Sequence, residues 1–156
     1  MDPRLDALIY QIAAEPEHWR PLVLTNGCFD LLHVGHVRYL TYARALGRAL
    51  IVGLNSDLSV RTLKGPTRPV NTQDHRAEVL RALRVVDGVV VFEGRTADAL
   101  IEALRPDFYV KGGDYAYTSL PEWSTAQKVG AQVVLVPVEV PISTTQLLSR
   151  GAGSPG

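Results

Sequence analysis

The chain has 156 residues, of which 46% are hydrophobic, and its 16 acidic and 16 basic residues balance to a net charge of zero. This length and hydrophobic content fit one domain with its own core, and the balanced charge gives no sign of a nucleic-acid or anionic-membrane partner. A single cysteine excludes an internal disulfide and a metal site built from cysteines. Without a basic N-terminal segment or an apolar run of membrane-spanning length, we expect a soluble, cytoplasmic protein.

The N-terminal residues predict a helix from Asp2 to Ala14. Asp2 is suited to the N-cap and Pro3 to the first helical position. Its apolar stripe consists of Leu5, Leu8, Ile9 and Ile12. This stripe packs either on the chain's own domain or on a partner chain. The segment 15–17 ends the helix.

A strand and a helix are expected next. Residues 21–24 form a short apolar run, which is typical of a buried strand in a parallel sheet. The helix that follows has apolar residues at three-residue steps, and Gly47 ends it. Those apolar residues are Val37, Leu40, Ala43 and Leu46.

Strands and helices alternate through the rest of the chain. The further predicted strands cover residues 49–54, 86–92, 107–110 and 132–136. Further helices are predicted at 56–63, 96–104 and 121–129. Another is capped by Asn71 or Thr72 and carries Arg76, Val79, Leu80 and Leu83. A last helix begins at 143–145 and includes 146–148. Two prolines and a glycine make 64–70 irregular, and 151–156 reads as a disordered tail.

This alternation predicts the fold class. We expect an α/β protein: a single Rossmann-like domain over residues 1–150 with a five-stranded parallel sheet and helices on both faces. Ligands of such sheets bind beyond the carboxyl ends of the strands. The unusual loops, at 26–36, 55–57, 111–114 and 137–145, fall at that edge or slightly beyond it. The sequence therefore predicts the site there.

The loop 26–36 carries the strongest chemical signal. His33 and His36 are three residues apart at the start of a helix, so they face the same way and can donate to one group. Gly35 between them lets an anion approach the backbone, and a helix N-terminus attracts phosphate. The ordinary interpretation is a pair of solvated or capping histidines. Metal ligation is a rival role, but no third ligand is evident nearby, so we predict no metal site.

The other candidates each have an ordinary interpretation as well. Lys64 is either a phosphate ligand or a solvated lysine, and Arg76 could simply pair with Glu78 or Asp74 at the surface. Asp114 follows two glycines and could be a turn residue. The sequence has neither a P-loop motif nor a G-x-G-x-x-G motif. These absences disfavour a P-loop NTPase and a dinucleotide-dependent dehydrogenase.

Two further side chains and one segment also have ordinary interpretations. Cys28 reads as a small buried residue rather than a nucleophile, because no base is assigned to it. Trp123 reads as a packing residue. The segment 143–145 is predicted to be a helix N-cap, which would also suit an anion.

A resemblance to a known family adds to these observations. Residues 27–30 and 33–36 resemble the G-x-F-D…H-x-G-H signature of the small, cytidylyltransferase-like nucleotidyltransferases. Over residues 22–149 the chain is most similar to the heptose 1-phosphate adenylyltransferase domain of bacterial ADP-heptose synthesis. In many bacteria that domain is fused to a sugar kinase, so the resemblance implies a stand-alone form here. The further segments that carry it are 55–57, 63–65, 68–71, the Arg76 helix, 110–115 and 143–145.

The resemblance implies roles for particular residues. The catalytic residues would be His33, His36, Lys64 and Arg76, with the histidines stabilising the transition state and all four contacting phosphates. The nucleotide-binding residues would be Asn26, Gly27, Cys28, Phe29, Asp30, Gly35, Gly113, Asp114, Ser143, Thr144 and Thr145. Of these, 143–145 would hold the β- and γ-phosphates, and Asp114 would lie near the base or the ribose.

The resemblance implies transfer of AMP from ATP to a phosphorylated sugar, such as D-glycero-β-D-manno-heptose 1-phosphate. Pyrophosphate would be released, and Mg²⁺ would be carried on the nucleotide phosphates. The implied partners are the nucleoside triphosphate and the phosphorylated sugar, with no nucleic acid or membrane, and a homodimer is compatible with the family. Val138 stands where glycerol 3-phosphate cytidylyltransferases carry an arginine, which disfavours CTP. The heptose enzymes also carry a glycine before 143–145 that this chain lacks.

Three alternatives stay open. One is a cytidylyltransferase acting on glycerol 3-phosphate or another phosphorylated polyol. The second is a non-catalytic nucleotide-binding regulatory module, against which the intact histidines, Lys64 and Arg76 speak. The third is a fragment resembling a class I aminoacyl-tRNA synthetase, which has little support because the second, lysine-rich motif and a basic surface are missing.

Overall fold

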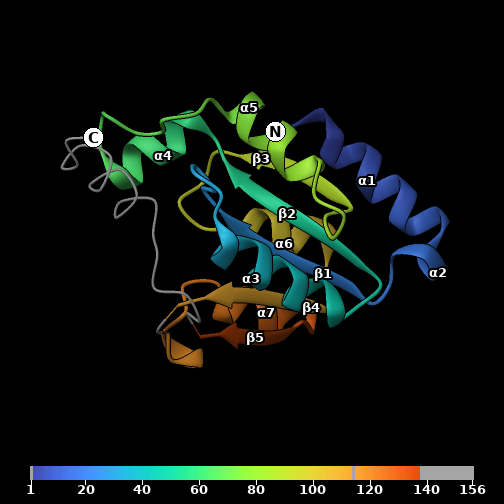
Figure 1. Cartoon of the computed structure of the whole chain (residues 1–156). Helices are drawn as coiled ribbons and strands as arrows, with labels where there is room; N and C mark the ends of the chain where they lie inside the picture. Colours follow the sequence, from blue (N-terminus) through green and yellow to red (C-terminus); the bar gives the residue numbers. More distant parts are fainter. Residues whose placement is uncertain (1, 114, 138–156) are drawn as a thin grey trace.

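The computed structural model describes residues 2–113 and 115–137. Its centre is a sheet of five parallel strands in the order β3-β2-β1-β4-β5 (Figure 1). The strands are β1 (Leu22–Gly27), β2 (Ala49–Asn55), β3 (Gly88–Phe92), β4 (Phe108–Gly112) and β5 (Gln132–Val136). The predicted five-stranded parallel sheet is therefore confirmed.

Helices cover both faces of this sheet, as predicted. They are α1 (Pro3–Ala14), α2 (Pro16–Trp19), α3 (Val34–Ala45), α4 (Asp57–Lys64), α5 (Gln73–Arg81), α6 (Asp98–Leu104) and α7 (Trp123–Val129), with a short 3₁₀ helix η1 (Tyr117–Ser119). Side chains of α1, α6 and α7 form one buried cluster with the sheet. Side chains of α3 and α5 form another with the opposite face. None of the helices within the described residues is long and apolar enough to span a membrane.

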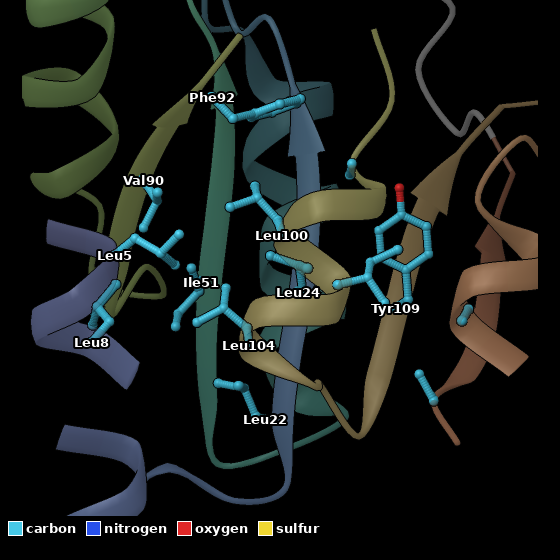
Figure 2. Close-up of a cluster of buried hydrophobic side chains, with 14 of the residues drawn as sticks. Leu5, Leu8, Leu22, Leu24, Ile51, Val90, Phe92, Leu100, Leu104 and Tyr109 are labelled. Carbon is cyan, nitrogen blue, oxygen red and sulfur yellow. The ribbon is translucent and has the colours of Figure 1, made fainter. Parts of the chain in front are cut away.

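The alternation of side chains along the strands divides the core in two. Leu22 and Leu24 of β1 belong to the cluster with α1, α6 and α7, whereas Val23 between them belongs to the cluster with α3 and α5. Figure 2 shows the first cluster, in which Leu5 and Leu8 of α1 lie beside β3. The stripe of α1 thus packs on its own domain through Leu5, Leu8 and Ile12, whereas Ile9, predicted on the same stripe, is 36% exposed. Partly buried Trp123 packs against the same cluster, as expected.

Helix α6 approaches the sheet closely at Gly53 of β2. A Cβ added to Gly53 would lie 2.6 Å from Cδ1 of Leu100, which is closer than two carbon atoms can approach. The glycine therefore lets α6 sit directly over the sheet, with Leu100 fully buried.

Two helices begin at the caps that their sequences predict, and a third, α4, has a cap at the start of its predicted range. The Asp2 carboxylate accepts a hydrogen bond from the amide of Arg4 at 3.0 Å, at the start of α1. The Thr72 hydroxyl accepts from the amide of His75 at 3.3 Å, and the Ser56 hydroxyl caps α4. Of the two cap residues suggested for α5, Asn71 and Thr72, the structure has Thr72.

Some details differ from the predictions. Helices α2 and η1 were not expected, and α6 and α7 each begin two residues later than predicted. Val37 and Val79, predicted on buried stripes, are 41% and 49% exposed. Val37 lies in the first turn of α3. In α5 the buried residues are 76, 77 and 80, so Val79 lies outside the buried face. The predicted last helix and the tail at 151–156 lie outside the described residues.

The packing of α6 gives a stability prediction. Replacing Leu100 by alanine removes a fully buried side chain and leaves a cavity, so we expect a loss of about 2–5 kcal/mol in the free energy of unfolding. The matched control is Leu58→Ala on α4, where the side chain is 57% exposed. That variant is expected to change the free energy by less than about 0.5 kcal/mol. Urea unfolding of both variants measures the difference, and equal losses would contradict the packing described here.

Candidate active site

The sheet topology fixes where the candidate site lies. The chain runs from β1 to β2 on one side and later returns to place β4 on the other side of β1. The connections therefore diverge between the carboxyl ends of β1 and β4, which is where sheets of this kind bind ligands. The loop 28–33 leaves β1 at this point and leads into α3.

The two histidines cap α3 reciprocally. His33 is the N-cap residue, and its Nδ1 accepts a hydrogen bond from the amide of Gly35 at 3.1 Å. His36 reaches back, and its Nδ1 accepts from the amide of His33 at 3.3 Å. The two rings lie with their centroids 4.0 Å apart. Each imidazole is thus held in place by the backbone of the helix that it caps.

These hydrogen bonds determine the tautomer of both rings. A nitrogen that accepts a hydrogen bond carries no proton, so in each neutral ring the proton is on Nε2. Burial, together with the positive charges of His33 and Lys64, lowers the pKa of His36 to about 4. His36 is therefore a neutral N–H donor at pH 7, beside the amides at the positive end of the α3 dipole.

Lys64 is the last residue of α4 and its side chain is exposed. Gly65 ends the helix with a φ of 103°, a left-handed conformation that favours glycine. Because the charge of Lys64 lowers the pKa of His36, the ammonium acts on the histidine site. Of the four predicted catalytic residues, His33 and His36 lie together at the start of α3, and Lys64 acts on His36 through its charge.

Arg76 has a different environment from the one that the ordinary interpretation suggested. It is 2% exposed and pairs with Asp57 at 2.8 Å, not with Glu78 or Asp74. Its guanidinium donates to the backbone carbonyls of Asn71 at 2.9 Å, and of Cys28 and Asn55 at 2.8 Å each. These contacts occupy four of the five N–H donors of an arginine. Arg76 therefore joins the loops that follow β1 and β2 to the start of α5.

Asp30 has a similar anchoring role. Its buried carboxylate accepts hydrogen bonds from the amides of Val70 at 2.7 Å and Asn71 at 2.9 Å, and from Nε of Arg68 at 3.1 Å. Burial by itself would raise the pKa of Asp30, but these hydrogen bonds and the Arg68 charge lower it overall. The carboxylate holds the irregular segment 65–72 against the loop that carries the histidines.

The rest of the loop after β1 is tightly packed. Phe29 has a φ of 46°, is buried, and lies with its ring centroid 5.4 Å from that of His36. A Cβ on Gly27 would lie 3.0 Å from the Phe29 ring, so this position favours glycine. The Asn26 side chain accepts a hydrogen bond from the Tyr109 hydroxyl. Of the remaining predicted nucleotide-binding residues, Gly113 has a φ of 116° after β4, and Asp114 and 143–145 lie outside the described residues.

Sequence reasoning missed several residues that the structure brings to this region. Arg68 and Asn71 entered only as parts of a familiar segment, and Lys111 and Glu122 did not enter as side chains at all. Asp57 is the ion-pair partner of Arg76, although it is 19 positions away in the sequence. The only sequence signal was the position of these residues at strand ends or in the constrained loop.

Within residues 2–113 and 115–137, no group of three or more histidine, cysteine, aspartate or glutamate side chains is arranged to hold a metal ion. The two carboxylates closest to the site along the chain, Asp30 and Asp57, already bind protein donors.

A family model described as "Cytidylyltransferase-like" matches residues 24–150. The chain belongs to the cytidylyltransferase-like family. It is accordingly a nucleotidyltransferase. The similarity includes β1, the capped start of α3 and the segments held by Asp30 and Arg76.

Curated relatives are similar to this member of the family over most of its length. Three that carry the name "Bifunctional protein HldE" come from Mesorhizobium japonicum, Koribacter versatilis and Hyphomonas neptunium. They are 52%, 51% and 47% identical over 89%, 83% and 94% of the chain. The chain spans only 27–30% of the length of these proteins.

A solved structure is also similar. The crystal structure of the lipopolysaccharide core biosynthesis protein from Thermoplasma volcanium superimposes with a TM-score of 0.62. It is 27% identical and covers 75% of this chain and 94% of its own.

The caps predict an NMR result. At pH 7, long-range ¹H–¹⁵N spectra should show His36 as a neutral ring protonated at Nε2, and the neutral tautomer of His33 should also carry its proton on Nε2, because each Nδ1 accepts a backbone hydrogen bond. The His36 resonances should titrate with a midpoint near pH 4. A proton on Nδ1 of either ring at pH 7 would contradict the capping arrangement.

The same pKa has a consequence for stability. Because the folded pKa of His36 lies below the ordinary value of 6.5, the unfolded chain binds more protons between these two values. His36 therefore makes the folded state progressively less stable as the pH falls from 6.5 to about 4. In His36→Asn this part of the pH dependence should disappear, and the same substitution at exposed His18 is the control.

The environment of Arg76 gives a further prediction. In Arg76→Lys one ammonium cannot reach three carbonyls and a carboxylate, so buried acceptors lose their partner. We expect a loss of about 3 kcal/mol or more in the free energy of unfolding. The exposed Arg84→Lys is the matched control and should change it by less than about 0.5 kcal/mol. A stable Arg76→Lys variant that loses only nucleotide affinity would instead indicate direct phosphate binding.

Proposed function

We propose that this nucleotidyltransferase transfers AMP from ATP to a phosphorylated sugar, such as D-glycero-β-D-manno-heptose 1-phosphate, and releases pyrophosphate. The observation that carries the proposal is the pair of Nε2–H donors fixed at the start of α3 by backbone hydrogen bonds. A helix N-terminus with two such donors and a nearby lysine suits a polyphosphate. The similarity to proteins named "Bifunctional protein HldE" supports the sugar phosphate as the acceptor.

The reaction needs no covalent enzyme intermediate. An oxygen of the sugar phosphate attacks the α-phosphorus of ATP, the bond from that phosphorus to the bridging oxygen breaks, and pyrophosphate leaves. The attacking oxygen is already an anion at neutral pH, so no general base is required. Catalysis then consists of positioning the two phosphates and stabilising the charge that develops between them.

His33, His36 and Lys64 are the residues to which we assign that stabilisation. The Nε2–H group of each imidazole donates a hydrogen bond without requiring a change of protonation, and the lysine adds a full positive charge. We assign Arg76 a positioning role, because four of its donors bind the chain itself and hold the loop that precedes the histidines.

Mg²⁺ on the nucleotide phosphates is part of the proposal. Asp30 and Asp57 have protein partners, so the nearby side chains fit an ion carried by the triphosphate better than one bound by carboxylates. Such an ion would neutralise charge on the phosphates when the nucleotide is bound. The residues 143–145 and Asp114 stay predicted nucleotide ligands. A homodimer and a cytoplasmic location also stay predictions.

A pyrophosphate-release screen tests the proposed activity. The purified chain is supplied with Mg²⁺ and each of four nucleoside triphosphates, against a panel that includes the heptose 1-phosphate, other sugar 1-phosphates and glycerol 3-phosphate. We expect release with ATP and a sugar 1-phosphate. Release only with CTP and glycerol 3-phosphate would favour the cytidylyltransferase alternative, and no release with any pair would favour a binding module.

The histidines give the sharpest mutational prediction. In His33→Ala or His36→Ala, one donor to the transition state is lost, and we expect turnover to fall about a hundredfold or more, with the fold retained. Replacing exposed His75 on α5 by alanine is the matched control and should leave turnover near that of the unchanged chain. Near-normal turnover in either variant of the pair would remove that histidine from the mechanism.

A further inference from the structure

A polar cluster lies on the sheet face opposite α3, at the carboxyl end of β4. Strand β4 pairs with β1 so that Tyr109 is opposite Leu24 and Val110 is opposite Thr25. Val110 packs toward α3 and α5, whereas Tyr109 packs toward α6 and α7. By the alternation of a strand, Lys111 shares the face of Tyr109, at the level of Asn26.

Lys111 is partly buried there without a partner among residues 2–113 and 115–137. Within those ranges its ammonium makes no hydrogen bond and no ion pair within 4.0 Å. Burial lowers the pKa of Lys111, and the nearby Glu122 and Cys28 oppose this effect. A partly buried ammonium with no acceptor among the described residues retains donors for another anion.

Glu122 is the buried counterpart of this lysine. It is 2% exposed, and its Oε1 accepts a hydrogen bond from the amide of Ala97 at 3.2 Å. Its Oε2 is buried and has no hydrogen-bond partner within the part of the chain that the structure describes. The carboxylate influences Lys111 and also Tyr109, whose pKa is raised by burial and by this neighbouring charge. Glu122 therefore lies near enough to Lys111 to raise the pKa of the ammonium, and no ion pair within 4.0 Å joins the two side chains.

The position of Lys111 points to a ligand rather than to packing. It is the last residue but one of β4, on the far side of the divergence point from the histidines, which follow β1. In the proposed reaction two anions must meet at this point. His33, His36 and Lys64 approach it from the side of β1 and β2, so they suit the triphosphate. The approaching phosphate also needs a cation, and Lys111 is the lysine at the end of the neighbouring strand.

We propose that Lys111 binds the attacking phosphate of the acceptor and that Glu122 is a positioning residue that acts through it. This proposal depends on the proposed function, because it identifies a ligand of the second substrate. Lys111 keeps its protons throughout, while the acceptor oxygen bonds to the α-phosphorus and pyrophosphate leaves.

Steady-state kinetics separate the two substrates. In Lys111→Met we expect the KM for the heptose 1-phosphate to rise roughly 10- to 100-fold, the size of a lost charge-assisted hydrogen bond. The KM for ATP should change less than about threefold, because Lys111 is not assigned to the nucleotide. A threefold change corresponds to less than half of the free energy of a tenfold change in affinity. Lys111→Arg keeps the charge and should retain most of the acceptor affinity. Lys128→Met removes an exposed lysine of α7 and serves as the control.

A double-mutant cycle tests the role of Glu122. We expect Glu122→Gln to raise the KM for the acceptor several-fold, and to have no further effect in a chain that already carries Lys111→Met. Additive effects of the two changes would overturn the positioning role. An unchanged acceptor KM in Lys111→Met, or an equal rise in both KM values, would overturn the assignment of Lys111.

Calorimetry distinguishes this proposal from the proposed function. The heptose 1-phosphate is titrated into the folded chain saturated with α,β-methylene ATP. The chain could bind the acceptor, with binding weakened by Lys111→Met, and yet never release pyrophosphate. That result would contradict the proposed function but not the assignment of Lys111. The absence of acceptor binding in the unchanged chain would contradict both. Thermal unfolding of each variant confirms that it is folded.

Discussion

The candidate site depends on how the first turn of α3 is capped. Two of its backbone amides, those of His33 and Gly35, donate to imidazole nitrogens, Nδ1 of His36 and Nδ1 of His33, where most helices use a hydroxyl or a carboxylate. One consequence is that both rings are fixed by the backbone. The other is chemical, because the same hydrogen bonds leave both Nε2–H groups as donors. A single local interaction thus sets the structure of the helix start and the chemistry that it offers.

Buried charges hold the segments around this helix start. Arg76 binds the carbonyls of Cys28, Asn55 and Asn71, so loops from three parts of the chain meet at one guanidinium. Asp30 holds the loop after α4 in a similar way. Removing one member of such a group leaves the others buried without partners, which costs more than the group contributes as a whole. The precision of the histidines therefore rests on residues that do not need to touch the substrates.

The sequence was sufficient for the fold because its signals were local. Apolar runs gave the strands, and Asp2 and Thr72 marked helix starts. The site was predictable where one short segment carried it, as with His33 and His36. It was not predictable where distant residues meet: the partner of Arg76 is Asp57, not its neighbours on the helix, and Lys111 gains its environment from Glu122 on another element. Exposed Val37 shows that apolar periodicity alone does not tell which turn of a helix is covered.

The central claim is that the capped start of α3 binds the triphosphate. The most direct measurement is a crystal structure of the chain with α,β-methylene ATP and Mg²⁺. The account predicts phosphate oxygens within about 3.2 Å of Nε2 of both histidines, the ordinary N–H···O distance. Phosphates bound elsewhere on the sheet edge, with both Nε2 atoms left to solvent, would contradict it.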